Sequence, residues 1–221
     1  LANSNSRHDR DEANIKAIAE AAELPTGQEM TDANVISTED SEVPVYAWFD
    51  KATGTMYYHS TAKDIYLNPD SSEMFKQYKG LASIEFMAGW KADRVINLNN
   101  IFDTCTSLVS LKGVENWNTS TVQEMKCAFY ACAKITTLDE LRTWDTSSVT
   151  DIVLRNDYYR QSWGLFQNCT ALKDATGISN WKLPKVTDFQ KTFLGCKALT
   201  TIGHIDTSAA QKLDYFFDGC T

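Results

Sequence analysis

The chain has 221 residues, of which 43% are hydrophobic and 23% charged, a composition typical of a globular protein with one or two domains. Its formal net charge is −8, and residues 1–42 carry −7 of it, so the remainder is nearly neutral. Neither part has the surplus of Lys and Arg that binds a polyanion, which excludes a basic nucleic-acid-binding domain. The sequence contains no apolar run of about 18 residues, so we expect no transmembrane segment. It begins at Leu1 without an initiator Met, and we expect a processed or truncated form.

The first 71 residues precede the repetitive part of the chain. Residues 1–42 are predicted to be an acidic leader or linker, partly helical, because Asp11 to Leu24 place a narrow apolar stripe before Pro25. Residues 43–60 predict two aromatic-rich strands around a turn from Asp50 to Gly54. We expect this hairpin to form an N-terminal cap, residues 43–71, over the first repeat.

An internal repeat of 27 residues occupies residues 72–221. Within one unit, Val122, Met125, Phe129 and Cys132 are spaced by 3, 4 and 3, which predicts a helix of about three turns. Possible capping boxes precede it, at 121–124 and again at 148–151. The steps of three that follow predict a brief strand at 136–138. Two residue types mark the period in successive units: Trp90, Trp117, Trp144 and Trp181, and Cys105, Cys132, Cys169, Cys196 and Cys220.

Units this small cannot bury an apolar face alone, so they must stack. The sequence therefore predicts an α/β repeat solenoid of about five right-handed, leucine-rich-repeat-like coils, each a helix plus a short strand. Ten extra residues interrupt the third unit, near 153–162. At the far end, Cys220-Thr221 stops where a strand should begin, so we expect either a longer natural chain or a bare end.

The motifs Trp-Asn-Thr-Ser-Thr-Val (117–122), Trp-Asp-Thr-Ser-Ser-Val-Thr-Asp (144–151) and the recurrent Phe-x-x-Cys-x-x-Leu resemble those of BspA-like bacterial surface proteins. This leucine-rich-repeat-like family is similar to the chain over about residues 72–221. The resemblance implies a secreted or cell-surface protein, in some members an adhesin. The chain departs from the family, which usually has Met before the Phe, at Ile101, Ala128, Leu165, Thr192 and Phe216.

No catalytic, cofactor or metal motif stands out. The cysteines share one repeat position, which favours buried thiols over disulfides, and Cys127 lies nearby on the predicted helix. The closest Cys pair, Cys127 and Cys132, has no His near it, so we expect no metal site. No Gly-rich nucleotide loop is present, and we expect no cofactor. Glycosylation sequons occur at Asn118 and Asn168.

Two aromatic features are candidates for binding. The tryptophan ladder could be a sugar-stacking platform, but its register with the apolar positions favours a structural role. The insertion concentrates residue types that are common at binding hot spots, and insertions in repeats become loops, often on the binding face. The alternative is a patch packed on a neighbouring coil. The candidate binding residues are Asn156, Asp157, Tyr158, Tyr159, Arg160 and Trp163.

The stacked repeat favours a non-catalytic interaction module. The resemblance implies that it is extracellular and adhesin-like, with a protein or glycan of a host or neighbouring cell as its partner. The alternative is a structural spacer that displays another domain beyond Thr221. An enzyme is the third hypothesis, since fold does not exclude function. The sequence leaves the oligomeric state open.

Overall fold

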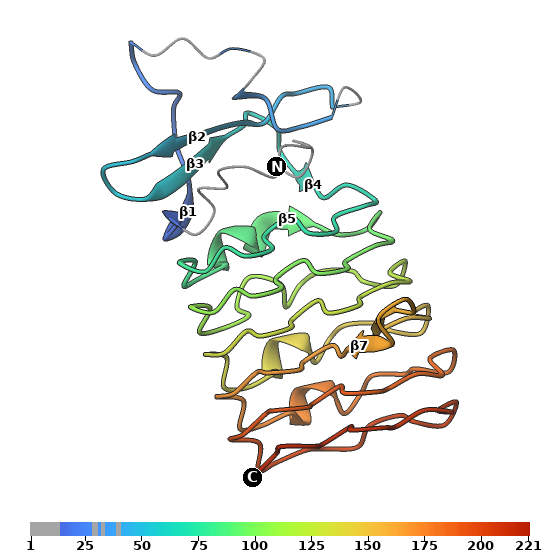
Figure 1. Ribbon diagram of the computed structural model, residues 1–221. Helices are drawn as coiled ribbons and strands as arrows, with labels where there is room; N and C mark the ends of the chain where they lie inside the picture. Colours follow the sequence, from blue (N-terminus) through green and yellow to red (C-terminus); the bar gives the residue numbers. More distant parts are fainter. Residues whose placement is uncertain (1–13, 28–30, 32–33, 39–40) are drawn as a thin grey trace.

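The computed structural model describes residues 14–27, 31, 34–38 and 41–221. A small sheet lies at one end, and below it the chain winds back and forth in layers down to the C-terminus (Figure 1). We call each 27-residue layer a coil. Strands β1 to β3 form the small sheet. After them, in chain order, come β4 (Ile65–Tyr66), η3 (Glu85–Gly89), β5 (Trp90–Lys91), η4 (Asp139–Leu141), β6 (Leu154–Asn156), β7 (Gln161–Trp163) and η5 (Thr176–Ile178), where η marks a 3₁₀ helix.

The sheet at the N-terminal end has three strands in the order β1–β3–β2. Strands β2 (Tyr46–Asp50) and β3 (Thr55–His59) form an antiparallel hairpin, and Gly54 closes its turn with a φ of 73°. The Tyr58 ring meets that of Trp90 edge-on at 5.3 Å, and its hydroxyl donates to the Phe86 carbonyl at 3.3 Å. The hairpin therefore covers the first coil.

The helix predicted over residues 11–24 is wrong in its described part. Residues 11–13 lie outside the described residues, and Ala17–Glu20 form strand β1, parallel to β3. So short a stretch forms only a marginal helix in water, whereas the open edge of β3 supplies a full set of backbone partners. Lys16 N–H, just before the strand, donates to the Gly54 carbonyl at 2.8 Å.

The predicted α/β solenoid of helix-plus-strand coils is also wrong, because the described residues contain no α-helix. Its helical turns are 3₁₀ segments, of which η3 is the longest. Where a helix was expected, the backbone N–H groups donate to the next coil: Asn100 to Lys126 at 2.8 Å, and Phe102 to Ala128 at 2.9 Å. Left-handed φ values recur four residues apart in this segment and preclude a helix. Examples are Asn100 and Thr104, Cys127 and Ala131, Lys191 and Gly195, and Tyr215 and Gly219.

Two rows of parallel backbone bridges hold successive coils together. We call the first the A ladder; it joins Asp70, Asn97, Glu124 and Asp151, and resumes between Asp188 and Lys212. The expected capping boxes belong to this ladder, since Glu124 and Asp151 are bridge residues rather than helix caps. The second, the B ladder, joins Thr137, Asp174 and Thr201, so the strand expected at 136–138 is reduced to a bridge.

Aromatic columns run through the interior. The rings of Trp117, Trp144 and Trp181 are parallel, with centroids 6.0 and 6.3 Å apart, and a phenylalanine column lies beside them. The tryptophans are buried rather than exposed as a platform. The phenylalanine rings stack from coil to coil in the order Phe75, Phe102, Phe129, Phe166, Phe193 and Phe217.

Five of the six cysteines, all but Cys127, form a third column. Each thiol of this column donates to the carbonyl of the preceding coil's phenylalanine, for example Cys132 to Phe102 at 3.2 Å and Cys196 to Phe166 at 3.2 Å. All six cysteines are free, and only Cys220 is not fully buried. Burial raises the pKa of the Cys105, Cys127 and Cys196 thiols to about 12. At physiological pH these thiols are therefore neutral groups packed in the interior.

Candidate functional site

The ten-residue insertion forms an antiparallel hairpin, β6–β7, that leaves the side of the stack (Figure 1). Its turn is closed by the Arg160 N–H, which donates to the Asp157 carbonyl at 3.3 Å, and Arg160 has a φ of 51°. The Asn156 side-chain oxygen accepts from the Tyr159 N–H at 3.1 Å. An ordered hairpin therefore presents the candidate residues.

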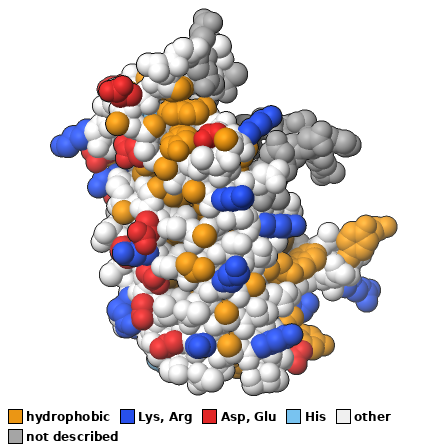
Figure 2. Space-filling view, turned by 90° about the vertical axis from the view of Figure 1, so that its left-hand side faces the viewer, with side chains coloured by type: hydrophobic (Ala, Val, Ile, Leu, Met, Phe, Trp, Pro, Cys, Tyr) orange, Lys and Arg blue, Asp and Glu red, His pale blue; other side chains and the backbone are white. Residues whose placement is uncertain are grey.

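The tip of this hairpin is an exposed aromatic pair. Tyr158 is 87% exposed and Tyr159 65%, and their rings meet edge-on with centroids 4.8 Å apart. These two side chains do not pack on a neighbouring coil, which leaves their ring faces open to a partner. A hydrophobic projection stands clear of the stack in Figure 2. Of the other candidates, Asp157 and Arg160 are exposed, whereas Asn156 and Trp163 are half-buried.

A cavity of about 240 Å³ lies at the base of the hairpin. Three cationic side chains line it: Arg155 and Arg160 from the hairpin and Lys191 from the next coil. The Lys191 amine donates to the Ser162 carbonyl at 3.1 Å and lies 6.0 Å from the centre of the Tyr215 ring. The other lining residues are Asp157, Gln161, Ser162, Gln190 and Tyr215.

The sequence pattern missed the part of this cavity that comes from later coils. Lys191 occupies the repeat position equivalent to Gly164, where the chain leaves the hairpin, and Tyr215 occupies it one coil further on. The register of the repeat therefore contained the signal that would have placed both beside the insertion. Arg155 directly precedes the candidate Asn156, and its place in the insertion was the signal that could have included it.

Charges in the cavity are only partly neutralised. Arg155 forms an ion pair with Asp188 of the next coil. Among the described residues, Arg160 and Lys191 have no carboxylate within ion-pair distance. Asp157 is the single acid in the lining. The lining residues therefore carry more positive than negative charge, with Asp188 paired to Arg155 and Asp214 accepting from the Gln190 amide at 2.7 Å beside them.

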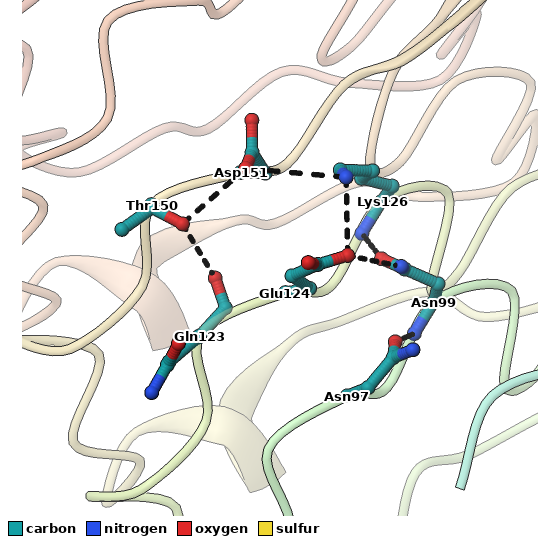
Figure 3. A network of polar contacts seen from close by, with 7 residues as sticks. All are labelled: Asn97, Asn99, Gln123, Glu124, Lys126, Thr150 and Asp151. Carbon is teal, nitrogen blue, oxygen red and sulfur yellow. Dashed lines mark hydrogen bonds and ion pairs between the residues drawn. The ribbon is translucent and has the colours of Figure 1, made fainter. Parts of the chain in front are cut away.

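On the coils before the hairpin, the same side of the stack carries a closed polar network (Figure 3). The Lys126 amine lies 3.0 Å from a carboxylate oxygen of Glu124 and 3.9 Å from one of Asp151, on the next coil. Asn99 donates to Glu124 at 2.6 Å and accepts from the Lys126 N–H at 2.7 Å. Asn99, followed by Lys126, lowers the pKa of Glu124 from its usual 4.5. This network links coils and leaves little charge for a ligand.

A second cavity, of about 460 Å³, lies near β4 and β5. Its charged groups have partners: the Lys91 amine lies 3.8 Å from a carboxylate oxygen of Asp64, and the neutral amide of Asn118 donates to Asp93 at 3.0 Å. The amide of one sequon, Asn118, is thus engaged in a hydrogen bond at an exposed position. The other sequon residue, Asn168, is half-buried and donates to the Tyr130 hydroxyl at 3.4 Å.

The described residues contain no group of three or more His, Cys, Asp or Glu side chains that could hold a metal ion. In the same part of the chain, no helix is long and apolar enough to cross a membrane.

Comparison with known proteins gives one family. A family described as "Mycoplasma protein of unknown function, DUF285" matches residues 69–155 and 161–221, and the chain belongs to it. This finding corrects the resemblance to BspA-like leucine-rich-repeat proteins, and nothing supports a leucine-rich repeat. No curated protein matches the chain, and no solved structure does. Residues 156–160, the hairpin tip, lie between the two matched segments.

Proposed function

We propose that the chain is a non-catalytic interaction module that binds a protein or glycan partner through the β6–β7 hairpin. The observation that supports this most strongly is the exposure of Tyr158 and Tyr159 on an ordered hairpin. Tyrosine supplies a large, rigid contact area with a polar end, and it is enriched where proteins bind partners. Two exposed tyrosine rings forgo the free energy that burying their apolar surface would contribute to folding.

The scaffold under the hairpin supports the same proposal. The β7 strand ends beside the next coil, where the Lys191 amine donates to the Ser162 carbonyl. A β-carbon added at Gly164 would lie 2.1 Å from the Lys191 carbonyl oxygen, so the two backbones are in close contact. This contact restricts how the hairpin can move against the stack, and a rigid binding element loses less entropy when it binds.

The non-catalytic part of the proposal rests on the titratable groups. The cysteines have raised pKa values and all but Cys220 are buried. Of the described histidines, His59 contacts the Ala21 carbonyl and His204 is exposed on a late coil. We include an extracellular or cell-surface location in the proposal, and protease treatment of intact cells tests it. Cleavage of the protein before lysis supports that location, and full protection contradicts it.

An array of immobilised glycans and extracellular matrix proteins tests the binding role. The triple variant Tyr158→Ser, Tyr159→Ser, Arg160→Gln should lose at least about tenfold in apparent affinity for whatever probe the wild-type chain binds. Tyr66→Ser is the matched control, because Tyr66 is also exposed but lies on β4. Equal binding by the triple variant and wild type would exclude the hairpin and favour the alternative, a structural spacer displaying another domain.

A further inference from the structure

The cavity at the hairpin base differs from an ordinary small-molecule pocket. Such pockets are mostly apolar, whereas this one is lined by three cations, two amides, a hydroxyl and a carboxylate, with Tyr215 as its one aromatic residue. Its occupant must therefore be polar. Because Arg160 and Lys191 lack carboxylate partners among the described residues, a negative charge on the occupant would supply one.

The cations are arranged at fixed points. Asp188 holds Arg155, the Ser162 carbonyl holds Lys191, and the Asp157–Arg160 turn fixes the backbone from which the third cation extends. A guanidinium presents N–H groups in a fork that matches the two oxygens of a carboxylate or sulfate. The cavity volume of about 240 Å³ leaves room for such a group and part of the molecule that carries it, and it is smaller than the roughly 300–1,000 Å³ of typical ligand pockets.

The surroundings point to a sugar as the carrier of that charge. The tip tyrosines offer two ring faces at an interplanar angle of 90°, suited to the apolar face of a pyranose ring. The Gln161 amide and the Ser162 hydroxyl provide donors and acceptors for its hydroxyls, whereas the Gln190 amide already donates to Asp214 at 2.7 Å. An acidic peptide could pair its carboxylates with the cations, but the cavity has no apolar pocket for the peptide's other side chains.

We propose that the cavity lined by Arg155, Arg160 and Lys191 binds the carboxylate or sulfate of an acidic saccharide whose ring lies against the hairpin tyrosines. This inference rests on the proposed binding role of the hairpin and narrows its partner to one class.

Calorimetric titration with four probes tests it: sialyllactose, which carries a carboxylate; sulfolactose, which carries a sulfate; neutral lactose; and hexaglutamate. We expect one or both acidic sugars to bind at least about tenfold more tightly than lactose, since only they can form charged hydrogen bonds with the cations. The stronger of the two identifies the anion. Binding should weaken with added salt, because the cavity is open to solvent.

Variants locate the site. Arg160→Gln and Lys191→Gln should each reduce acidic-sugar affinity about tenfold and leave lactose binding unchanged. Lys197→Gln is the matched control, since it removes one charge from an exposed position outside the cavity. Thermal unfolding of each variant establishes that it is folded before it is titrated.

Three results would overturn the inference: acidic sugars that bind no better than lactose, hexaglutamate that binds more tightly than either sugar, or cavity variants that bind like wild type. The proposed function can still stand in each case. It falls only if the triple variant of the tip retains full binding on the array. Lys191→Gln, which is not part of that variant, tests the cavity separately.

Discussion

Two neighbouring regions on the same side of the stack differ in whether their lysines have carboxylate partners. Before the hairpin, the A ladder bridges Glu124 to Asp151, and Lys126 lies between their carboxylates. At the hairpin, no bridge joins Asp151 to Asp188 within the described residues. Lys191 there contacts a carbonyl and lines a cavity. The insertion opens the ladder on one side of the stack, and the cations at the opening become available to a ligand.

The interior under both regions is the same, because the thiol and phenylalanine columns continue past the hairpin. The largest effect that we predict is a fall in stability at alkaline pH, caused by the buried thiols. Since burial raises the thiol pKa values above their usual 9, folding favours the neutral thiols. Their contribution is complete below pH 9 and is lost as pH rises toward 12. Each such thiol should lower the free energy of unfolding by about 1.4 kcal/mol per pH unit in that window.

Urea denaturation in the presence of a reductant at several alkaline pH values measures this slope. Cys196→Ala should be less stable at neutral pH but show a shallower alkaline slope than the wild-type chain. Because the tyrosines and lysines titrate equally in both, the difference isolates the thiol. Identical slopes would show that Cys196 is not protected in the folded state.

The close contact at the hairpin base gives the next largest effect. In Gly164→Ala, the new β-carbon would meet the Lys191 carbonyl oxygen and carbon at 2.1 and 2.3 Å, so one backbone must move. We expect a loss of about 3 kcal/mol in urea denaturation. Gly89→Ala is the control, because a β-carbon there meets nothing within 4 Å. An equal, small change in both variants would mean that the hairpin adjusts freely.

Neutralising one lysine in each region tests the comparison directly. Lys126→Gln breaks contacts to Glu124 and Asp151 and should cost about 1 kcal/mol, less at high salt. Lys191→Gln, which breaks no carboxylate contact, should cost less and depend less on salt. Thermal unfolding at two ionic strengths measures both, and a larger salt effect for Lys191→Gln would reverse our assignment of the paired and unpaired cations.

The smallest effect concerns acid. Because Asn99 and Lys126 lower the pKa of Glu124 in the folded chain, its contribution is present above its usual pKa of 4.5. It is lost as pH falls through the lowered value. Glu124 is partly exposed, so the amount is under about 1 kcal/mol. The stability difference between wild type and Glu124→Gln should therefore shrink on acidification, and a difference that does not vary with pH would exclude the linkage.

The sequence contains the period of the coils but not their backbone conformation. Residues such as Val122, Met125, Phe129 and Cys132 are spaced as on a helix, and the same spacing arises when a chain of turns directs every third or fourth side chain inward. The left-handed positions that distinguish the two are occupied by Asn100, Thr104, Cys127 and Ala131. Few of these are residues that signal a turn, so the pattern favoured a helix.

The sequence predicted part of the candidate site, the hairpin, but not the cavity at its base. The broken period locates the insertion, and its residue types indicate binding. The cavity depends on Lys191 and Tyr215, which a local sequence window does not connect to the hairpin. The charge balance also depends on the fold, because the fold brings Asp188 to Arg155 while Arg160 and Lys191 lack a carboxylate partner among the described residues.

After the hairpin the chain returns to its former register, and the phenylalanine and tryptophan columns continue through Phe166, Phe193 and Trp181. The B ladder likewise passes from Thr137 to Asp174 and Thr201 without interruption. The insertion between Val153 and Gly164 therefore interrupts the A ladder but leaves the aromatic columns and the B ladder continuous. The aromatic columns and the B ladder, rather than the A ladder, keep the coils in register across the insertion.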